Sequence, residues 1–267
     1  MAAASSLSIV SNLSPRLWRV WARNLLVYMR TWKVNFIPPL AEPALYILAF
    51  GAGLGGMVGT IRVGGEEVSY TAYIAPGLIA ASVMWQSFYE NTYASFVRMY
   101  YQKTFDAMLA TPLSLEDVIT AEILWGATKA ATGTALMGVV IAAFGYIDLP
   151  GGLWLLPLSV LGGLAFGSVA MWITGVTPTI DMFNLPIFLF ITPMFLFSGA
   201  FFPVDGLPVW ASGLARLLPL YHLTQASRAL CLGRADTGII WNALYLIAFT
   251  AVFYPLAVRA MRRRLIK

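Results

Sequence analysis

The stretch Arg98–Glu122, RMYYQKTFDAMLATPLSLEDVITAE, decides how this chain is organised, because it is the longest polar interruption in the first two-thirds of an otherwise apolar sequence. Its charged side chains require water or a protein contact. We predict a short helix over Thr104–Ala110 that ends before Pro112, because proline donates no N–H and disfavours helical geometry in the preceding residue. Ser114 is predicted to cap a second helix, with Asp117 at the capping-box position.

The composition is that of an integral membrane protein. The chain has 267 residues, of which 59% are hydrophobic and 11% charged, and a mean hydropathy of +0.75. Soluble domains are about one-quarter charged. We therefore expect an all-α polytopic protein that forms a single transmembrane domain over residues 1–267. One cysteine and one histidine exclude an internal disulfide and a Cys- or His-rich metal site, so no metal and no nucleic-acid partner are expected.

Six apolar runs are long enough to cross a bilayer, which takes about 20 helical residues. We expect spans at about 36–58, 71–95, 118–146, 152–176, 181–203 and 238–260. Most lysines and arginines lie in the N-terminal segment, in the connection between the second and third spans, and at the C-terminus. The positive-inside rule then places both termini and the polar region 98–117 in the cytoplasm. The first fourteen residues have no basic segment and no apolar core, so no cleaved signal peptide is expected.

An amphipathic helix is predicted over residues 14–33, before the first span. Ser14 and Pro15 are typical of a helix N-terminus. Helical spacing places two opposed sets on the helix: Trp18, Trp21, Leu25, Met29 and Trp32 on one side, and Arg16, Arg19, Arg23 and Arg30 on the other. This pattern favours a helix lying in the membrane interface, with an ordinary soluble amphipathic helix as the alternative.

Residues 204–234, between the last two spans, are too apolar for a free loop and too rich in proline for one spanning helix. Two short external re-entrant helices fit, about Pro208–Leu218 and Leu220–Leu232, the second closed by Gly233. This segment carries the polar residues Arg216, His222 and Arg228. His222 is interpreted as a hydrogen-bonded structural residue.

An alternative reading of the chain is an intramembrane hydrolase with a dyad of Ser198 and His222. The surrounding residues lack the glycine expected two positions before such a serine.

Several polar and aromatic residues near the cytoplasmic ends of the spans are candidates for a substrate path. They are Glu42, Trp85, Phe88, Tyr89, Glu90, Asp181 and Asn184. A carboxylate in a membrane segment is a functional hypothesis by default, but structural ion pairing is an equally open interpretation here. Two interpretations are open for the aromatic residues Trp85, Phe88 and Tyr89 of the second span: helix packing and substrate contact.

Glycines at 51, 55 and 59, and at 163 and 167, predict close helix approach. The sequence contains no G-x-x-x-x-G-K-[ST] loop, so the chain does not bind ATP by that route.

Three segments together resemble the permease subunits of type-2 ABC exporters, in particular the NodJ-like branch associated with lipo-chitooligosaccharide export. They are TFDAMLATPLSLEDVITAEILWGATKA, EPALYILAFGAGLGGMV and FLFSGAFFPVDGLPVWASGLARLLPLYHLTQASRAL. The resemblance covers nearly the whole chain from the amphipathic helix onward. It implies a non-catalytic, multi-pass subunit of the bacterial inner membrane that forms a homodimer.

The resemblance also implies a partner ATPase in two copies, which binds the ATP and Mg that this chain does not. The expected substrate is an amphipathic molecule leaving the cytoplasm, such as a lipo-oligosaccharide, a lipid-linked glycan or a hydrophobic drug. ATPase coupling is implied for Lys103, Thr104, Phe105, Asp106, Met108, Leu109, Pro112, Leu113 and Glu116. Of these, Phe105, Met108 and Leu109 are expected to be the apolar contacts. The alternative is a secondary transporter driven by an ion gradient, without an ATPase.

Overall fold

The computed structural model describes residues 12–63, 66–234 and 237–266, and most of them are helical. Five helices are long and apolar enough to cross a membrane: Trp32–Val58, Leu115–Ala143, Leu149–Val176, Ile180–Phe197 and Thr237–Leu265. These match five of the six predicted runs and confirm a helical polytopic membrane protein. The predicted run at 71–95 is helical too, but it is not among the five.

The first half of the chain contains the amphipathic helix, the first long helix and the central pair. The elements are α2 (Leu17–Arg30), α3 (Trp32–Tyr46), η1 (Ile47–Leu54), α4 (Gly55–Val58), β1 (Thr60–Val63), β2 (Glu66–Ser69), α5 (Tyr70–Tyr89), η2 (Glu90–Ala94), η3 (Val97–Tyr101), α6 (Thr104–Leu109) and α7 (Leu115–Ala143).

The second half contains two further long helices and several short ones. The elements are α8 (Leu149–Gly152), α9 (Leu155–Val176), η4 (Ile180–Phe183), α10 (Asn184–Pro186), η5 (Ile187–Ile191), α11 (Thr192–Phe197), η6 (Val204–Gly206), α12 (Val209–Arg216), α13 (Pro219–Cys231) and α14 (Thr237–Leu265).

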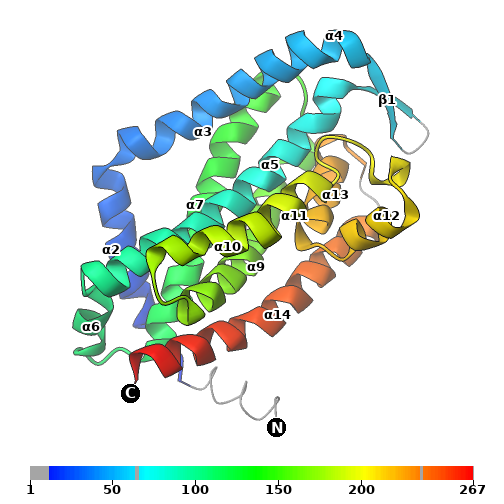
Figure 1. Ribbon diagram of the computed structural model, residues 1–267. Coiled ribbons are helices and arrows are strands. Elements are labelled where there is room, and N and C mark those ends of the chain that lie inside the picture. The colour runs from blue at the N-terminus through cyan, green and yellow to red at the C-terminus, as the bar shows by residue number, and fades with distance from the viewer. Residues whose placement is uncertain (1–11, 64–65, 235–236, 267) are drawn as a thin grey trace.

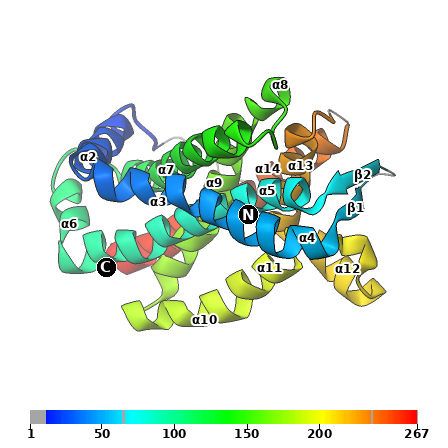
Figure 2. The same ribbon diagram turned by 90° about the horizontal axis from the view of Figure 1, so that it is seen from above.

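The bundle has two distinct ends. Helices α2 and α6 and the C-terminal end of α14 lie at one end, whereas α4, β1 and α12 lie at the other (Figure 1). Helices α5, α7 and α9 supply most of the buried core, and α14 packs along α9. Seen from above, α10 lies at one edge of the bundle and α8 at the opposite edge (Figure 2). The polar stretch Arg98–Glu122 therefore lies at the same end of the bundle as the amphipathic helix.

Close packing between α9 and its neighbours depends on glycine, as predicted. A Cβ on Gly163 would lie 2.6 Å from the Cα of Ala127 in α7, and one on Gly167 would lie 2.9 Å from Asn91 Nδ2. In the first span, a Cβ on Gly55 would lie 3.3 Å from Thr71 Oγ1, whereas a Cβ on Gly59 would have open space. The glycines of α9 therefore pack inside the chain, and those of the first span do so only in part.

A short antiparallel hairpin joins α4 to α5, an element that the all-α prediction omits. Its strands pair Thr60 with Ser69 and Val63 with Glu66. Ser69 then caps α5 by accepting a hydrogen bond from the N–H of Ala72 at 3.3 Å. The sequence signal was two glycines between runs that alternate in polarity, which is typical of a hairpin turn.

The two short helices predicted before the last span are confirmed as α12 and α13. Gly233 follows α13 with φ of +66°, the left-handed conformation that closes many helices. Whether they enter the membrane from outside stays a prediction.

Replacing Gly163 with leucine should destabilise the fold, because the new side chain meets the backbone of α7. We expect a loss of about 1–3 kcal/mol in the free energy of unfolding, the usual cost of overpacking. Gly138→Leu is the matched control, since a Cβ there meets nothing within 4 Å. Thermal unfolding of the detergent-solubilised variants measures the difference, and equal midpoints would contradict the packing described for α9.

Candidate functional site

A cavity of about 830 Å³ lies between the α2–α3 segment and the α5 and α7 helices. Its walls combine aromatic rings with charged groups. The aromatic residues are Tyr28, Trp85, Tyr89, Tyr93 and Trp125, and the charged ones are Arg23, Glu42, Glu90, Arg98 and Lys129. Such a surface suits a ligand with both an apolar and a polar part, because the rings supply contact area and the charged groups orient it.

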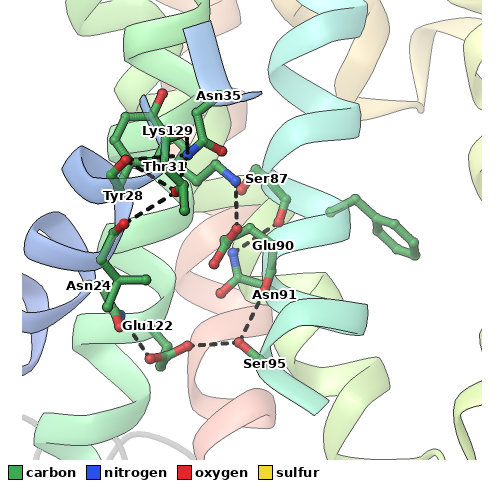
Figure 3. A network of polar contacts seen from close by, with 12 residues as sticks. Asn24, Tyr28, Thr31, Asn35, Ser87, Glu90, Asn91, Ser95, Glu122 and Lys129 are labelled. Atoms are coloured by element: carbon green, nitrogen blue, oxygen red, sulfur yellow. Dashed lines mark hydrogen bonds and ion pairs between the residues drawn. The ribbon is translucent and has the colours of Figure 1, made fainter. Parts of the chain in front are cut away.

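Four charged residues form what we call the charge cluster: Glu90, Arg98, Glu122 and Lys129. Glu90 accepts hydrogen bonds from Arg98 Nη1 at 2.7 Å and from Lys129 Nζ at 2.8 Å. Arg98 Nε donates to Glu122 Oε2 at 2.9 Å. Two carboxylates and two cations balance, which reduces the cost of placing them inside the protein. Figure 3 shows Lys129 reaching Glu90, with Glu122 further along the network.

Glu122 connects three segments that are distant in sequence. Its Oε1 accepts from Asn24 Nδ2 at 2.9 Å, and its Oε2 accepts from Ser95 Oγ at 2.9 Å (Figure 3). The Glu122 side chain is 0% exposed, so these partners replace the water it would otherwise need. The cluster thereby ties α2 to α7 and to the helical segment that continues α5.

The partners Asn24, Glu122 and Lys129 were absent from the predicted substrate path. For Glu122 and Lys129, helical spacing in the sequence indicates that the two side chains act together. Glu122 and Lys129 are seven residues apart on one helix and so share a face. An acid and a base on the same face of an apolar helix indicate partners on a neighbouring helix. The contact with Asn24 depends on tertiary packing.

The structure separates the predicted path residues into two groups. Trp85, Tyr89, Glu90 and Glu42 line the cavity. The other three, Phe88, Asp181 and Asn184, do not line it.

Each of these three has a different position. Phe88 is 0% exposed and packs in the core, whereas Asp181 lies exposed on η4. Asn184 is linked to the cavity indirectly, since its Oδ1 accepts a hydrogen bond from the Tyr93 hydroxyl at 3.5 Å. Glu90 is in a structural ion pair, one of the two interpretations open at the sequence level.

The helix–turn–helix at the polar stretch is present as predicted. Helix α6 ends before Pro112, and Ser114 caps α7 by accepting from the N–H of Asp117 at 3.0 Å. Asp117 Oδ2 in turn accepts from the N–H of Ser114 at 3.1 Å, which completes the capping box. Lys103, the residue before α6, adopts the left-handed conformation with φ of 54°.

The structure corrects the expected orientation of the coupling residues. Phe105 is 0% exposed and Met108 is buried, and both belong to the chain's own core. Glu116 is also buried and forms an ion pair with Arg262 of α14. These three therefore face inward and are not available as docking contacts. The outward surface of the turn is formed by Lys103, Asp106, Ala107, Ala110, Thr111 and Pro112, while Thr104, Leu109 and Leu113 are half-buried.

The N-terminal segment is hydrogen-bonded to this turn and to the start of α7. Ser14 donates its N–H to Asp117 Oδ1 at 2.7 Å and its hydroxyl to Asp117 Oδ2 at 2.9 Å. Arg16 Nη1 donates to the carbonyl of Pro112 at 2.6 Å. The turn between α6 and α7 therefore cannot move without the start of α2.

Helix α2 packs on α7 through one face, formed by Val20, Asn24 and Tyr28. Trp21 Nε1 donates to Thr128 Oγ1 at 2.9 Å, and Trp18 stacks on the Trp21 ring at 4.2 Å. The arginines differ in position: Arg16, Arg19 and Arg30 are exposed, whereas Arg23 is half-buried and lines the cavity. The position of this helix in a membrane interface stays a prediction.

The polar residues of the α12–α13 region are structural. The two ring nitrogens of His222 lie 2.8 Å from Asn242 Oδ1 and 2.9 Å from the Arg216 carbonyl. Ser198 Oγ donates instead to the Phe195 carbonyl at 2.8 Å. The proposed Ser198–His222 dyad is therefore wrong, because both side chains are bonded to other groups.

Two arginines of this region have contrasting surroundings. Arg216 forms an exposed ion pair with Asp205 at 3.1 Å. Arg228 is buried, stacks over the Tyr73 ring at 3.9 Å and donates to the Gly199 carbonyl at 2.7 Å. Arg228 therefore holds α13 against α5 and the loop after α11.

These features define a class: a polytopic helical membrane protein with a cavity of mixed polarity and a helix–turn–helix at one end. Comparison with known proteins gives the family. Residues 15–232 match the ABC-2 type transporter family, and the chain belongs to it. It is 42% identical over 248 residues to nodulation protein J of Rhizobium leguminosarum bv. trifolii, which covers 93% of each chain.

More distant relatives agree with this assignment. Nodulation protein J of Rhizobium meliloti is 38% identical over 246 residues, 92% of each chain. The inner membrane transport permease YadH of Escherichia coli is 25% identical over 248 residues, 91% of this chain and 93% of the relative. The chain is therefore a NodJ-like membrane subunit of the ABC transporter type.

Removing both partners of the Glu90–Lys129 pair should destabilise the protein by less than the two single removals added together. Glu90→Gln leaves an excess cation and Lys129→Gln an excess carboxylate, each expected to cost about 3–5 kcal/mol in the free energy of unfolding. The double variant retains the Arg98–Glu122 pair, in which the charges balance. Its loss in the free energy of unfolding should therefore be smaller than the sum of the two single losses. Chemical unfolding of all three variants gives the coupling energy.

Lys103→Gln is the matched control, because its pair with Asp106 is exposed and spans 4.0 Å. Such a pair contributes about 0–1 kcal/mol. Additive losses at positions 90 and 129 would show that the charges do not act as one unit.

Proposed function

We propose that this chain is the permease subunit of an ATP-driven exporter that moves an amphipathic substrate out of the cytoplasm. A separate ATPase, present in two copies and binding ATP and Mg, would drive it through the turn between α6 and α7. The observation that carries the proposal is this turn. It has an outward surface at one end of the bundle, and its inner side is bonded to the N-terminal segment and to α14.

The contacts of the turn support a mechanical role. Phe105 anchors α6 in the core, Asp117 ties α7 to the N-terminal segment, and Glu116 pairs with Arg262 near the end of α14. A force applied to the outer surface of α6 would therefore displace α2, α7 and α14 together. Because α2 and α7 form two walls of the large cavity, such a displacement would change its width.

The cavity supports an amphipathic substrate. Its rings, such as Trp85 and Tyr89, stack at 5.3 Å and offer flat apolar surface, while Arg23 adds a cationic group beside the balanced charge cluster. A lipo-oligosaccharide is the specific substrate that we propose, since two of the relatives described above are named nodulation proteins. A lipid-linked glycan or a hydrophobic drug has the same mixed character.

We further propose six spans, with both termini in the cytoplasm of an inner-membrane protein. The span that is added to the five long helices would be the helical segment from α5 through η3, second in chain order. This segment carries more polar residues than the other five. A second copy of the chain would complete the exporter. Leu185, Phe188 and Leu189 are between 55% and 76% exposed near α10 and are available to that copy or to lipid.

The docking surface is tested by substitution of Ala107, which is exposed on α6. Ala107→Arg should leave the fold intact and reduce recovery of the ATPase with the tagged permease by at least about tenfold, the equivalent of 1.4 kcal/mol. Gly213→Arg is the matched control, because Gly213 lies on α12 at the opposite end with nothing near its Cβ position. Recovery of ATPase activity after gentle detergent extraction is the measurement.

Phe105→Asp has a different expected outcome. It buries an unpaired carboxylate in the core, so we expect loss of folded protein and not a selective loss of docking. Undiminished ATPase recovery with Ala107→Arg would overturn the docking assignment. Transport by the purified chain alone, driven by an ion gradient and insensitive to ATP, would instead support a secondary transporter.

A further inference from the structure

A second cavity, separate from the one described above, lies between the ends of α9 and α14. It has a volume of about 620 Å³. We call it the arginine pocket, because three of its lining residues are Arg259, Arg263 and Arg264. Trp172, Val176 and Leu256 provide the apolar part of the wall. The pocket thus places cationic groups beside apolar surface at the ends of two membrane-spanning helices.

No residue that lines the pocket is acidic. Arg259 is already engaged in another interaction, so Arg263 and Arg264 are the cations that carry the argument. The nearby Arg262 is used elsewhere, in the ion pair with Glu116. Arg264 is fixed in place, since its Nη1 donates to the carbonyls of Thr174 and Thr177, the first at 2.6 Å. A guanidinium has five N–H donors, so Arg264 keeps donors for a further acceptor.

The two helices are held close together at the base of the pocket. A Cβ on Gly175 would lie 2.7 Å from the Cβ of Ala260, so α9 and α14 are in direct contact there. Trp172 packs edge-on against Phe253 with ring centroids 5.7 Å apart. The apolar wall therefore continues along the helices away from the arginines, in the direction that a lipid chain would take.

We propose that the arginine pocket binds an anionic phospholipid of the membrane. The guanidinium groups would contact the phosphate, because arginine is suited to bind the oxygens of a phosphate group. One acyl chain would lie along Trp172 and Leu256. Basic pockets between membrane helices commonly take anionic headgroups in this way. The proposal requires only that the chain is a membrane protein, and it is independent of the ATPase.

The test uses the full chain purified in detergent and phosphatidylglycerol as the probe. Native mass spectrometry counts the lipid molecules retained as phosphatidylglycerol is titrated, with phosphatidylcholine and inorganic phosphate in parallel. An arginine near an anionic lipid surface contributes about a fivefold gain in binding. The variant Arg263→Gln should therefore bind phosphatidylglycerol roughly fivefold more weakly, with an unchanged unfolding temperature. The wild-type chain should bind phosphatidylcholine and free phosphate much more weakly.

Two further variants complete the test. Arg19→Gln removes the same charge from an exposed position of α2 and should retain the tightly bound lipid. Val176→Trp fills the apolar part of the pocket without altering an arginine, and should also weaken phosphatidylglycerol binding. Equal lipid binding by wild type and the Arg263→Gln variant would overturn the proposal. So would a variant that keeps its lipid but loses the ATPase, since the arginines would then be a protein contact.

Discussion

The charge cluster between α2, α7 and the helical segment that continues α5, in which both carboxylates are buried, is the constraint on which the rest of this permease depends. Glu122 is fully buried, so its carboxylate is stable only while Arg98, Ser95 and Asn24 surround it. Together with Glu122, these partners belong to three segments of the chain. The helices must therefore meet at one place and in one register, which also defines the walls of the adjacent cavity.

Hydrogen bonds and ion pairs of buried carboxylates continue from the charge cluster to the end of the bundle. Glu122 and Asp117 both lie in the first turns of α7, and each is bonded to the N-terminal segment, through Asn24 and Ser14 respectively. Ion pairing of Glu116 adds α14 to this assembly. The start of α7 is therefore the point where the amphipathic helix, the turn between α6 and α7, and the last helix are joined. That arrangement would link the proposed docking surface to the cavity.

Local sequence patterns predicted the elements well, because their signals lie within a few residues. Pro112, Ser114 and Asp117 identified the end of α6 and the cap of α7, and the apolar runs identified the long helices. The orientation of side chains was harder to predict. An apolar stripe on α6 is equally compatible with a core and with a partner, and the structure places Phe105 in the core. Contacts such as Asn24 with Glu122 depend on tertiary packing and have no local signal.

The central claim is that this chain transports only together with an ATP-hydrolysing subunit. Its most direct test is a gentle purification of the tagged chain from its own host, followed by mass spectrometry of the proteins that accompany it. We predict a soluble subunit in roughly stoichiometric amount whose sequence contains the G-x-x-x-x-G-K-[ST] phosphate-binding loop. A chain that purifies alone, at several salt concentrations and after crosslinking in the membrane, would contradict the claim.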